Sequence, residues 1–325
     1  MSRDPTFVGI DVSKATLEVC EWPDGDVKTF DNHAEGVDDL LAWLAPRNVA
    51  VVAFEHTGWT TRTLADRLRD AEIPSVILDA KKVRRFATII GREAKTDRLD
   101  ARLIAQFAAT LRPNVSAMPT QEERDLQDLA RRVRQLGIIA AGEKGKLKQA
   151  YRGMTLESVG SHLAWLEAES GRLVAEIDRR IGQRPDWRRR SEIIQSMPCC
   201  GPILARTLIT ELPELGQIGP KRLASLVGIA PMPFESGPTS KRRRLRGGRH
   251  WVRRTLYMCS VVGTRNNPVL TRYYRRLVAA GKPPMSARAA TMRKILIVLN
   301  AMVRDDRTWQ PPPHGVPSND GTEGS

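Results

Sequence analysis

Short apolar runs alternate with segments of helical spacing over the first hundred residues, and this alternation restricts the fold more than any other feature. The runs are TFVGIDVSKATLEVCEW at 6–22, VAVVAFEHT at 49–57 and PSVILDA at 74–80. Short continuous apolar runs are typical of strands buried inside a sheet. The first run is predicted to be one strand, which pairs through the turn PDGD with a second strand, VKTFDN, in a hairpin.

Helical patterns lie between and after these strands. Residues 35–46 carry apolar side chains at helical spacing, and further helices are predicted around Leu64 and from about Thr96. A hairpin followed by strand–helix alternation predicts an α/β domain over residues 1–115. The stretch LRPNVSAMPT at 111–120 has the composition of a linker.

The remainder of the chain is predicted to be mostly helical. Residues 116–195 are dense in Arg and Glu and hold two long helical patterns, which predicts an antiparallel helix pair or a dimerising coiled coil. A mostly α-helical C-terminal domain is expected at 196–310, and it opens with a helix-hairpin-helix-like element at 196–215. The turn before Pro202 in this element either binds a phosphate or only packs two helices together. The tail at 311–325 is rich in Pro and polar residues and is predicted to be disordered.

The charge is unevenly distributed. The chain has a net charge of +15 and a pI of about 10.2, which indicates a polyanionic partner. Between Ser236 and Gln310 there are 18 Lys and Arg residues against two acids, so this part carries essentially the whole net charge. The strongest nucleic-acid contact is expected there. The candidate binding residues are Lys241, Arg242, Arg243, Arg244, Arg246, Arg249, Arg253 and Arg254.

The cysteines and the chain ends indicate an intracellular protein. None of the four cysteines has the paired spacing of a zinc site, so reduced thiols of a cytosolic protein are expected. The N-terminus lacks the pattern of a signal peptide, and the apolar stretch ILIVLNAMV is too short to cross a bilayer. A location in the bacterial cytoplasm without membrane contact is therefore predicted.

Four acids form the first candidate site. Asp11 and Glu55 end two apolar strands, and they converge if those strands are neighbours in the sheet. Asp97 and Asp100 are three residues apart in a predicted helix and share one face of it. Taken alone, each acid could simply be solvated at the surface. As a set they predict a site for Mg²⁺, with Mn²⁺ as an alternative, that could act on a phosphodiester.

Ser236 is the second candidate site. It lies in FESGPTSKRRRLRGGRH at 234–250, where a serine next to a glycine precedes a run of arginines. Ser236 is either a turn residue in a solvated basic loop or a nucleophile directed at a phosphate. A phosphoryl nucleophile does not require a neighbouring histidine, because catalysis at phosphate depends mainly on positioning and on neutralising the phosphoryl oxygens.

The order of these features resembles a known family. GIDVSK with the acid set Asp11, Glu55, Asp97 and Asp100 is similar to the RuvC-like branch of the ribonuclease H fold. Together with the later SG and GGRHWVRRTLYM, roughly residues 6–305 resemble the DEDD transposases of the IS110 insertion-sequence family, which are bridge-RNA-guided recombinases. The resemblance implies that the four acids bind Mg²⁺ and that Ser236 attacks DNA to form a covalent 5′-phosphoserine intermediate.

The resemblance also implies the partners. Homodimers would assemble into a homotetramer on donor and target double-stranded DNA, and a structured non-coding bridge RNA would pair with both. Two alternatives remain open from the residues alone. The chain could be a hydrolytic RuvC-like nuclease of the Holliday-junction resolvase type, without a covalent intermediate, or a non-catalytic nucleic-acid-binding protein.

Overall fold

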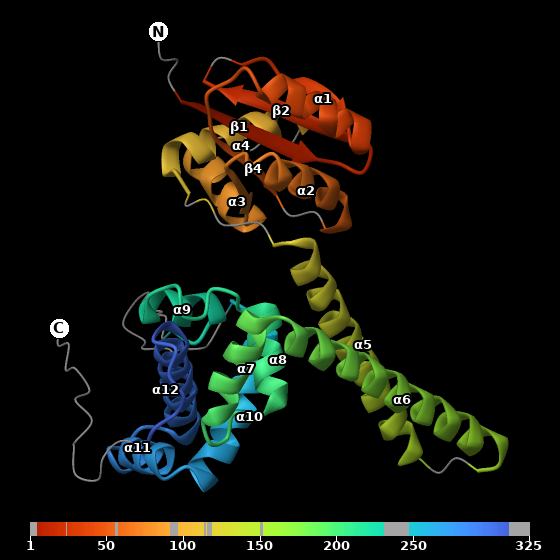
Figure 1. Ribbon diagram of the computed structural model, residues 1–325, viewed down its shortest axis with the longest axis vertical. Coiled ribbons are helices and arrows are strands. Elements are labelled where there is room, and N and C mark those ends of the chain that lie inside the picture. Colours follow the sequence, from red (N-terminus) through yellow and green to blue (C-terminus); the bar gives the residue numbers. More distant parts are fainter. Residues whose placement is uncertain are drawn as a thin grey trace. The chain divides into compact units, whose positions relative to one another are not determined.

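The chain forms two compact units, Met1–Glu122 and Glu123–Ser325 (Figure 1). The structure is a computed structural model. Apart from the side chains of residues 59 and 97–99, it describes residues 5–23, 25–55, 58–91, 97–113, 115, 119–149, 152–230 and 247–311.

The first unit is built on a mixed five-stranded sheet with the strand order β3-β2-β1-β4-β5. The strands are β1 Thr6–Val12, β2 Thr16–Trp22, β3 Lys28–Asp31, β4 Val49–Glu55 and β5 Ser75–Leu78. Strand β2 is antiparallel to both of its neighbours, β1 and β3, and β1, β4 and β5 run parallel. The predicted strands at 49–57 and 74–80 are thus confirmed, as is the α/β character of this unit.

The prediction of a single strand over residues 6–22 is wrong, because the chain reverses at Ser13. The Ser13 hydroxyl oxygen accepts hydrogen bonds from the backbone N–H groups of Ala15 and Thr16, at 3.2 and 2.8 Å. The Ser13 backbone N–H also donates to the Thr16 carbonyl at 2.9 Å. A serine hydroxyl therefore closes the turn without Gly or Pro, and the apolar alternation continues into β2 with no visible break.

Helices cover both faces of the sheet. The helical elements are α1 Ala34–Leu44, the 3₁₀ turn η1 Gly58–Thr61, α2 Arg62–Asp70, α3 Ala80–Ile89 and α4 Asp97–Leu111. Apolar side chains of α1 and α2 pack with one side of the sheet, and those of α3 and α4 pack with the other. Helix α3 is absent from the sequence prediction. Its start is fixed by Asp79, whose carboxylate accepts from the backbone N–H of Lys81 at 2.9 Å.

The period of two along β1 assigns its side chains to these faces. Val8, Ile10 and Val12 belong to the core shared with α1 and α2. Gly9 and Asp11 therefore face the side that α4 covers, because successive residues of a strand point to opposite faces. The same alternation places Glu55 on the α4 side, since Val51 and Ala53 pack there.

The second unit is helical throughout its described part. Its helices are α5 Gln121–Leu147, α6 Met154–Gln183, α7 Pro185–Ser196, α8 Pro202–Glu211, α9 Pro220–Val227, α10 His250–Asn266, α11 Pro268–Ala279 and α12 Pro284–Arg304. Helices α5 and α6 form an antiparallel pair, here called the helical arm (Figure 1). Leu126 packs with Ile177 near one end of the arm, and Leu136 packs with Leu166 and Leu173 further along it. This is the first of the two predicted arrangements.

Proline marks most helix starts in this unit. Helices α7, α8, α9, α11 and α12 all begin with Pro at the first helical position, where the missing N–H is not needed and the fixed φ suits the helix. Apolar side chains of α7 to α12 share one core. No helix in the described part of the chain combines the length and the apolar composition that a bilayer span requires.

Candidate functional site

Asp11 and Glu55 lie at the carboxyl ends of two neighbouring parallel strands. In the β1–β4 pair the register matches Ile10 with Phe54, and each carboxylate residue directly follows its member of that pair. Both side chains belong to the sheet face that α4 covers. Adjacent parallel strands present their carboxyl ends at the same sheet edge, where ligands of open α/β sheets commonly bind.

Gly9 brings helix α4 close to this edge. A Cβ atom at Gly9 would overlap the backbone nitrogen of Ala105 and the carbonyl oxygen of Ala101. The absence of a side chain therefore lets the α4 backbone pack directly on β1, and Asp100 enters the site one residue before Ala101. This role of Gly9 was not predicted from the sequence. The signal was available, because a glycine inside an apolar strand often marks the close approach of another backbone.

The electrostatics of Glu55 tie three of the acids together. The pKa of Glu55 is raised above its ordinary value, first by burial and then by the negative charges of Asp11 and Asp100. Asp79 adds to this effect, and the positive charge of Arg84 opposes it. Negative charges gathered in this way are stabilised by a cation, so this edge of the sheet favours a positively charged ligand.

The fourth predicted acid, Asp97, is the first residue of α4, and its side chain lies outside the described part. Among the described residues, no group of three or more His, Cys, Asp or Glu side chains is arranged closely enough to hold a metal ion. The chemistry of the donor set nevertheless fits a hard divalent cation, because carboxylate oxygens are its preferred ligands and Glu55 already bears the cost of two nearby negative charges.

The segment that contains Ser236 lies outside the described residues, which resume at Gly247. The following predicted nucleic-acid-binding residues fall in the same segment: Lys241, Arg242, Arg243, Arg244 and Arg246. The roles predicted for Ser236 and for these five residues therefore stay predictions. The structure does describe the two points at which the chain leaves the core before this segment and returns after it.

Those two points are held against each other. A Cβ atom at Gly248 would overlap the backbone nitrogen of Gly228, and one at Gly228 would overlap the Gly247 carbonyl oxygen. The Arg253 guanidinium then joins both sides, because its Nη1 donates to the Val227 carbonyl at 3.2 Å and to the Gly247 carbonyl at 2.5 Å. The ends of the 231–246 segment are thus fixed at one place on the core.

The remaining two predicted binding arginines have different surroundings. Arg249 forms a two-pronged ion pair with Glu214, with both nitrogen–oxygen distances at 2.5 Å. Arg254 is exposed and lies over the Trp251 ring, with 5.4 Å from the guanidinium carbon to the ring centroid. Arg254 also lines a hollow of about 480 Å³ with Tyr257. Within the described contacts, Arg253 and Arg249 hold the fold together, whereas Arg254 is directed to the surface.

The turn between α7 and α8 is built by packing. Gly201 precedes the first residue of α8, Pro202, as the sequence predicts. Met197 and Cys200 are buried in the core of this unit. Cys199 adopts a φ of +88°, in the left-handed region that favours glycine. The turn therefore stores backbone strain at the position where such elements usually carry glycine.

Comparison with protein families gives two matches. Residues 8–154 match a family model of DEDD transposases of IS110 type, and residues 191–275 match the transposase IS116/IS110/IS902 family. All four predicted acids lie within the first match. Ser236 and the eight predicted nucleic-acid-binding residues lie within the second.

Individual relatives agree with the family models. The chain is 23% identical over 325 residues to the pilin gene-inverting protein of Moraxella bovis, with 94% of this chain and 97% of that protein covered. It is 34% identical over 143 residues to the uncharacterized 42 kDa protein of insertion element IS900 from Mycobacterium paratuberculosis, which covers 42% of this chain and 35% of that protein. A comparable match is the 44.8 kDa protein of insertion element IS116 from Streptomyces clavuligerus, 32% identical over 149 residues.

Proposed function

Since this chain belongs to the IS116/IS110/IS902 family of transposases and is therefore a DNA-rearranging enzyme, we propose that it exchanges DNA strands through a covalent bond to Ser236. The substrates are donor and target double-stranded DNA of an insertion sequence. The relative from Moraxella bovis is named for inverting a gene. Inversion and transposition both require DNA to be cut and rejoined, which supports strand exchange as the reaction class.

The proposal depends above all on the position of Asp11, Glu55 and Asp100 around one edge of the sheet. The three acids are near enough that the charges of Asp11 and Asp100 raise the pKa of Glu55. The strand order β3-β2-β1-β4-β5, with β2 antiparallel to both of its neighbours and β1, β4 and β5 parallel, supports a RuvC-like variant of the ribonuclease H fold. In that fold the first strand carries the first acid, which agrees with the place of Asp11 at the end of β1.

Asp11, Glu55, Asp97 and Asp100 would hold Mg²⁺ or Mn²⁺. A bound divalent ion would supply charge neutralisation at the scissile phosphate and acidify an attacking hydroxyl. The Ser236 oxygen forms a bond to phosphorus, and the bond between phosphorus and the 3′ oxygen breaks. The serine proton passes to the departing 3′ oxygen, which leaves a free 3′-hydroxyl and a 5′-phosphoserine. A 3′-hydroxyl of the second duplex then attacks the phosphoserine, rejoins the strand and returns the proton to Ser236.

The arginines of the C-terminal unit assist this chemistry by binding phosphate oxygens. Guanidinium groups bind phosphate in a two-pronged geometry and stay charged at any physiological pH. Lys241, Arg242, Arg243, Arg244, Arg246 and Arg254 are assigned to DNA or RNA backbones. Arg253 joins the two ends of the 231–246 segment, and Arg249 is paired with Glu214.

The partners follow from the family resemblance. A structured bridge RNA selects donor and target, and homodimers assemble into a homotetramer in which the acid site and the serine of different subunits meet. The helical arm acts as a coiled-coil dimerisation region, which is supported by exposed apolar side chains on α5 and α6, among them Ile138 and Trp165 at 58% and 55% exposure. We propose that the chain is organised as an acid domain at 1–115, a dimerisation region at 116–195, a serine domain with a helix-hairpin-helix-like element at 196–310, and a tail at 311–325.

The test is to trap the covalent species. Purified protein is mixed with its flanking non-coding RNA, both DNAs and Mg²⁺, and the products are separated on a denaturing gel. We expect a protein–DNA adduct whose linked residue maps to Ser236 by mass spectrometry. Ser236→Ala should abolish the adduct while DNA and RNA binding persist, and Ser240→Ala is the matched control that should retain it.

Two results would contradict the proposal. An adduct that survives in Ser236→Ala would remove the serine assignment. Nicked DNA without any adduct would favour a hydrolytic nuclease, which needs Asp11 but not Ser236.

A further inference from the structure

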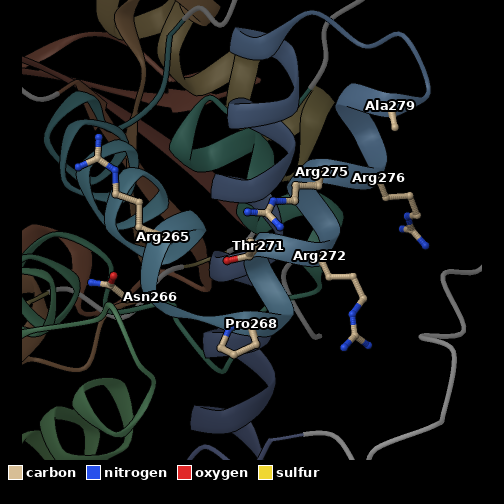
Figure 2. A pocket seen from close by; sticks show the side chains of 8 residues that line it. All are labelled: Arg265, Asn266, Pro268, Thr271, Arg272, Arg275, Arg276 and Ala279. Atoms are coloured by element: carbon tan, nitrogen blue, oxygen red, sulfur yellow. The ribbon is translucent and has the colours of Figure 1, made fainter.

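A hollow of about 710 Å³ lies where α10 meets α11, well separated in sequence from the proposed acids and from Ser236. Figure 2 shows the side chains that line it. They are Arg265, Asn266, Pro268, Thr271, Arg272, Arg275, Arg276 and Ala279. Four of these eight residues are arginines, and none is acidic.

The arginines come from two helices. Arg265 lies in the last turn of α10, and Arg272 and Arg276 are four residues apart on one face of α11. Figure 2 shows Arg272 and Arg276 extending to the same side of α11, and Arg275 extending toward the side on which α10 and Arg265 lie. All four side chains are exposed. The hollow is therefore a surface site with positive charge on both of its walls.

Three of these four charges have no acidic partner in the described part of the fold. Arg265, Arg272 and Arg275 form no ion pair with any residue that the structure describes, and Arg276 lies 5.5 Å from the centroid of the Tyr273 ring. Four gathered cations repel one another, so an anion that binds between them gains free energy from each. The amides that start α11 do not compete for this anion, because the Asn267 side chain accepts from the N–H groups of Val269 and Leu270.

The residues that line the hollow indicate which kind of anion it binds. The described lining residues include no aromatic ring on which a base could stack, and Pro268 and Ala279 offer little apolar surface to a small organic ligand. Guanidinium groups suit phosphate oxygens geometrically as well as electrically. Contacts to phosphates position a nucleic acid without reading its sequence.

We propose that the hollow formed by Arg265, Arg272, Arg275 and Arg276 binds the sugar–phosphate backbone of a nucleic acid, independently of its sequence. The site goes beyond the strand-exchange chemistry proposed above, because it uses none of the residues assigned to that chemistry. Its role is to anchor a strand or duplex on α10 and α11.

The test compares two pairs of arginines in the same chain. Arg272→Ala/Arg275→Ala removes two charges from the hollow, and Arg172→Ala/Arg179→Ala removes two exposed charges from α6, where each arginine is paired with a glutamate. Binding of labelled duplex DNA and of labelled structured RNA is measured by fluorescence anisotropy without divalent cations, over a range of salt concentrations. Because no cleavage occurs, failure of the serine mechanism would not alter this result.

For Arg272→Ala/Arg275→Ala we expect the affinity to fall by about 10- to 100-fold near 0.1 M salt, because two phosphate contacts are lost. Each phosphate contact contributes about 0.9 to the slope of log affinity against log salt concentration. The slope should fall by about two, and by the same amount for unrelated sequences. The α6 pair should change affinity less than about threefold. Arg272→Lys/Arg275→Lys keeps both positive charges and the length of the side chains. This variant should therefore retain most of the slope of log affinity against log salt concentration.

The outcomes separate cleanly. A loss with duplex DNA alone identifies the substrate as the occupant, and a loss with RNA alone identifies the guide. Unchanged binding of both nucleic acids, or an equal loss in the α6 pair, would overturn the proposal. Thermal melts of the two double-alanine variants show whether each one keeps the stability of the unaltered protein.

Discussion

Two glutamates of this chain have opposite electrostatic surroundings, one on the helical arm and one at the edge of the sheet. On α6, hydrogen bonds from Arg179 and Arg180 lower the pKa of Glu176 to about 2. At the end of β4, burial and the charges of Asp11 and Asp100 raise the pKa of Glu55. The arm neutralises its charges within the fold, whereas the sheet edge gathers like charges whose repulsion a bound cation would relieve.

The arginines divide in the same way. Arg172 and Arg179 on α6 each bind a glutamate three residues earlier, at 2.7 Å. The arginines of α11 gather around a hollow that is lined by no acid among the described residues. Residue type alone therefore says little about role in this molecule, and the presence of a partner within the fold says more.

The largest expected effect concerns DNA cleavage. Asp11→Asn should lower the rate of strand cleavage by at least ~10³-fold, because one ligand and one negative charge are lost from the proposed cation site. Glu176→Gln also removes one carboxylate, yet it should leave cleavage within about twofold of the original. Gel assays measure the rate of strand cleavage by both variants. Equal rates for the two variants would contradict a special role of the carboxylates at the sheet edge.

A glycine-to-alanine change should alter stability with opposite sign in the two regions. Gly9→Ala inserts a methyl group into the backbone of α4 and should lower the free energy of unfolding by about 1–3 kcal/mol. Gly171→Ala on α6 meets open space and should raise it by about 0.5–1 kcal/mol through higher helix propensity. Urea denaturation of both variants measures the difference. A stabilising Gly9→Ala would mean that α4 does not rest on β1 as described.

The smallest expected effect is a pH dependence of stability in the presence of a chelator. Glu55 binds its proton more tightly in the folded state, so its ionisation should reduce stability as pH rises above 4.5, its ordinary pKa. Glu176 has the opposite sign, since its stabilising effect is present above pH 4.5 and is lost as pH falls toward 2. As the pH rises, the melting temperature of Glu55→Gln should increase relative to that of the unaltered protein. The melting temperature of Glu176→Gln should decrease relative to it. If the melting temperatures of both variants changed with pH in the same way, the two glutamates would not have opposite pKa shifts.

Much of the fold could be predicted from local patterns. The strands at 49–57 and 74–80 were recognisable because they are short, apolar and continuous, and α1 was recognisable from its helical spacing. The long helices of the arm follow from the same period. These elements are specified by the burial of their own side chains, which the sequence displays directly.

The missed features depend on contacts that are not visible in a local pattern. The turn at Ser13 is closed by a hydroxyl in place of glycine or proline, so β1 and β2 merged into one predicted strand. The closeness of α4 to Gly9 is a tertiary contact between distant residues. The convergence of Asp11 and Glu55 was predicted only on the condition that their strands are neighbours, and the strand order, which single strands do not reveal, meets that condition.

The joined ends of the 231–246 segment have a consequence for engineering. Gly228 and Gly248 meet on the core, and Arg253 ties both sides together, so the distance between the ends does not depend on what lies between them. The entropic cost of loop closure grows slowly with length, by about 0.6 kcal/mol for each doubling. The stretch can therefore be treated as an exchangeable cassette, into which the corresponding residues of a relative are grafted on a single scaffold.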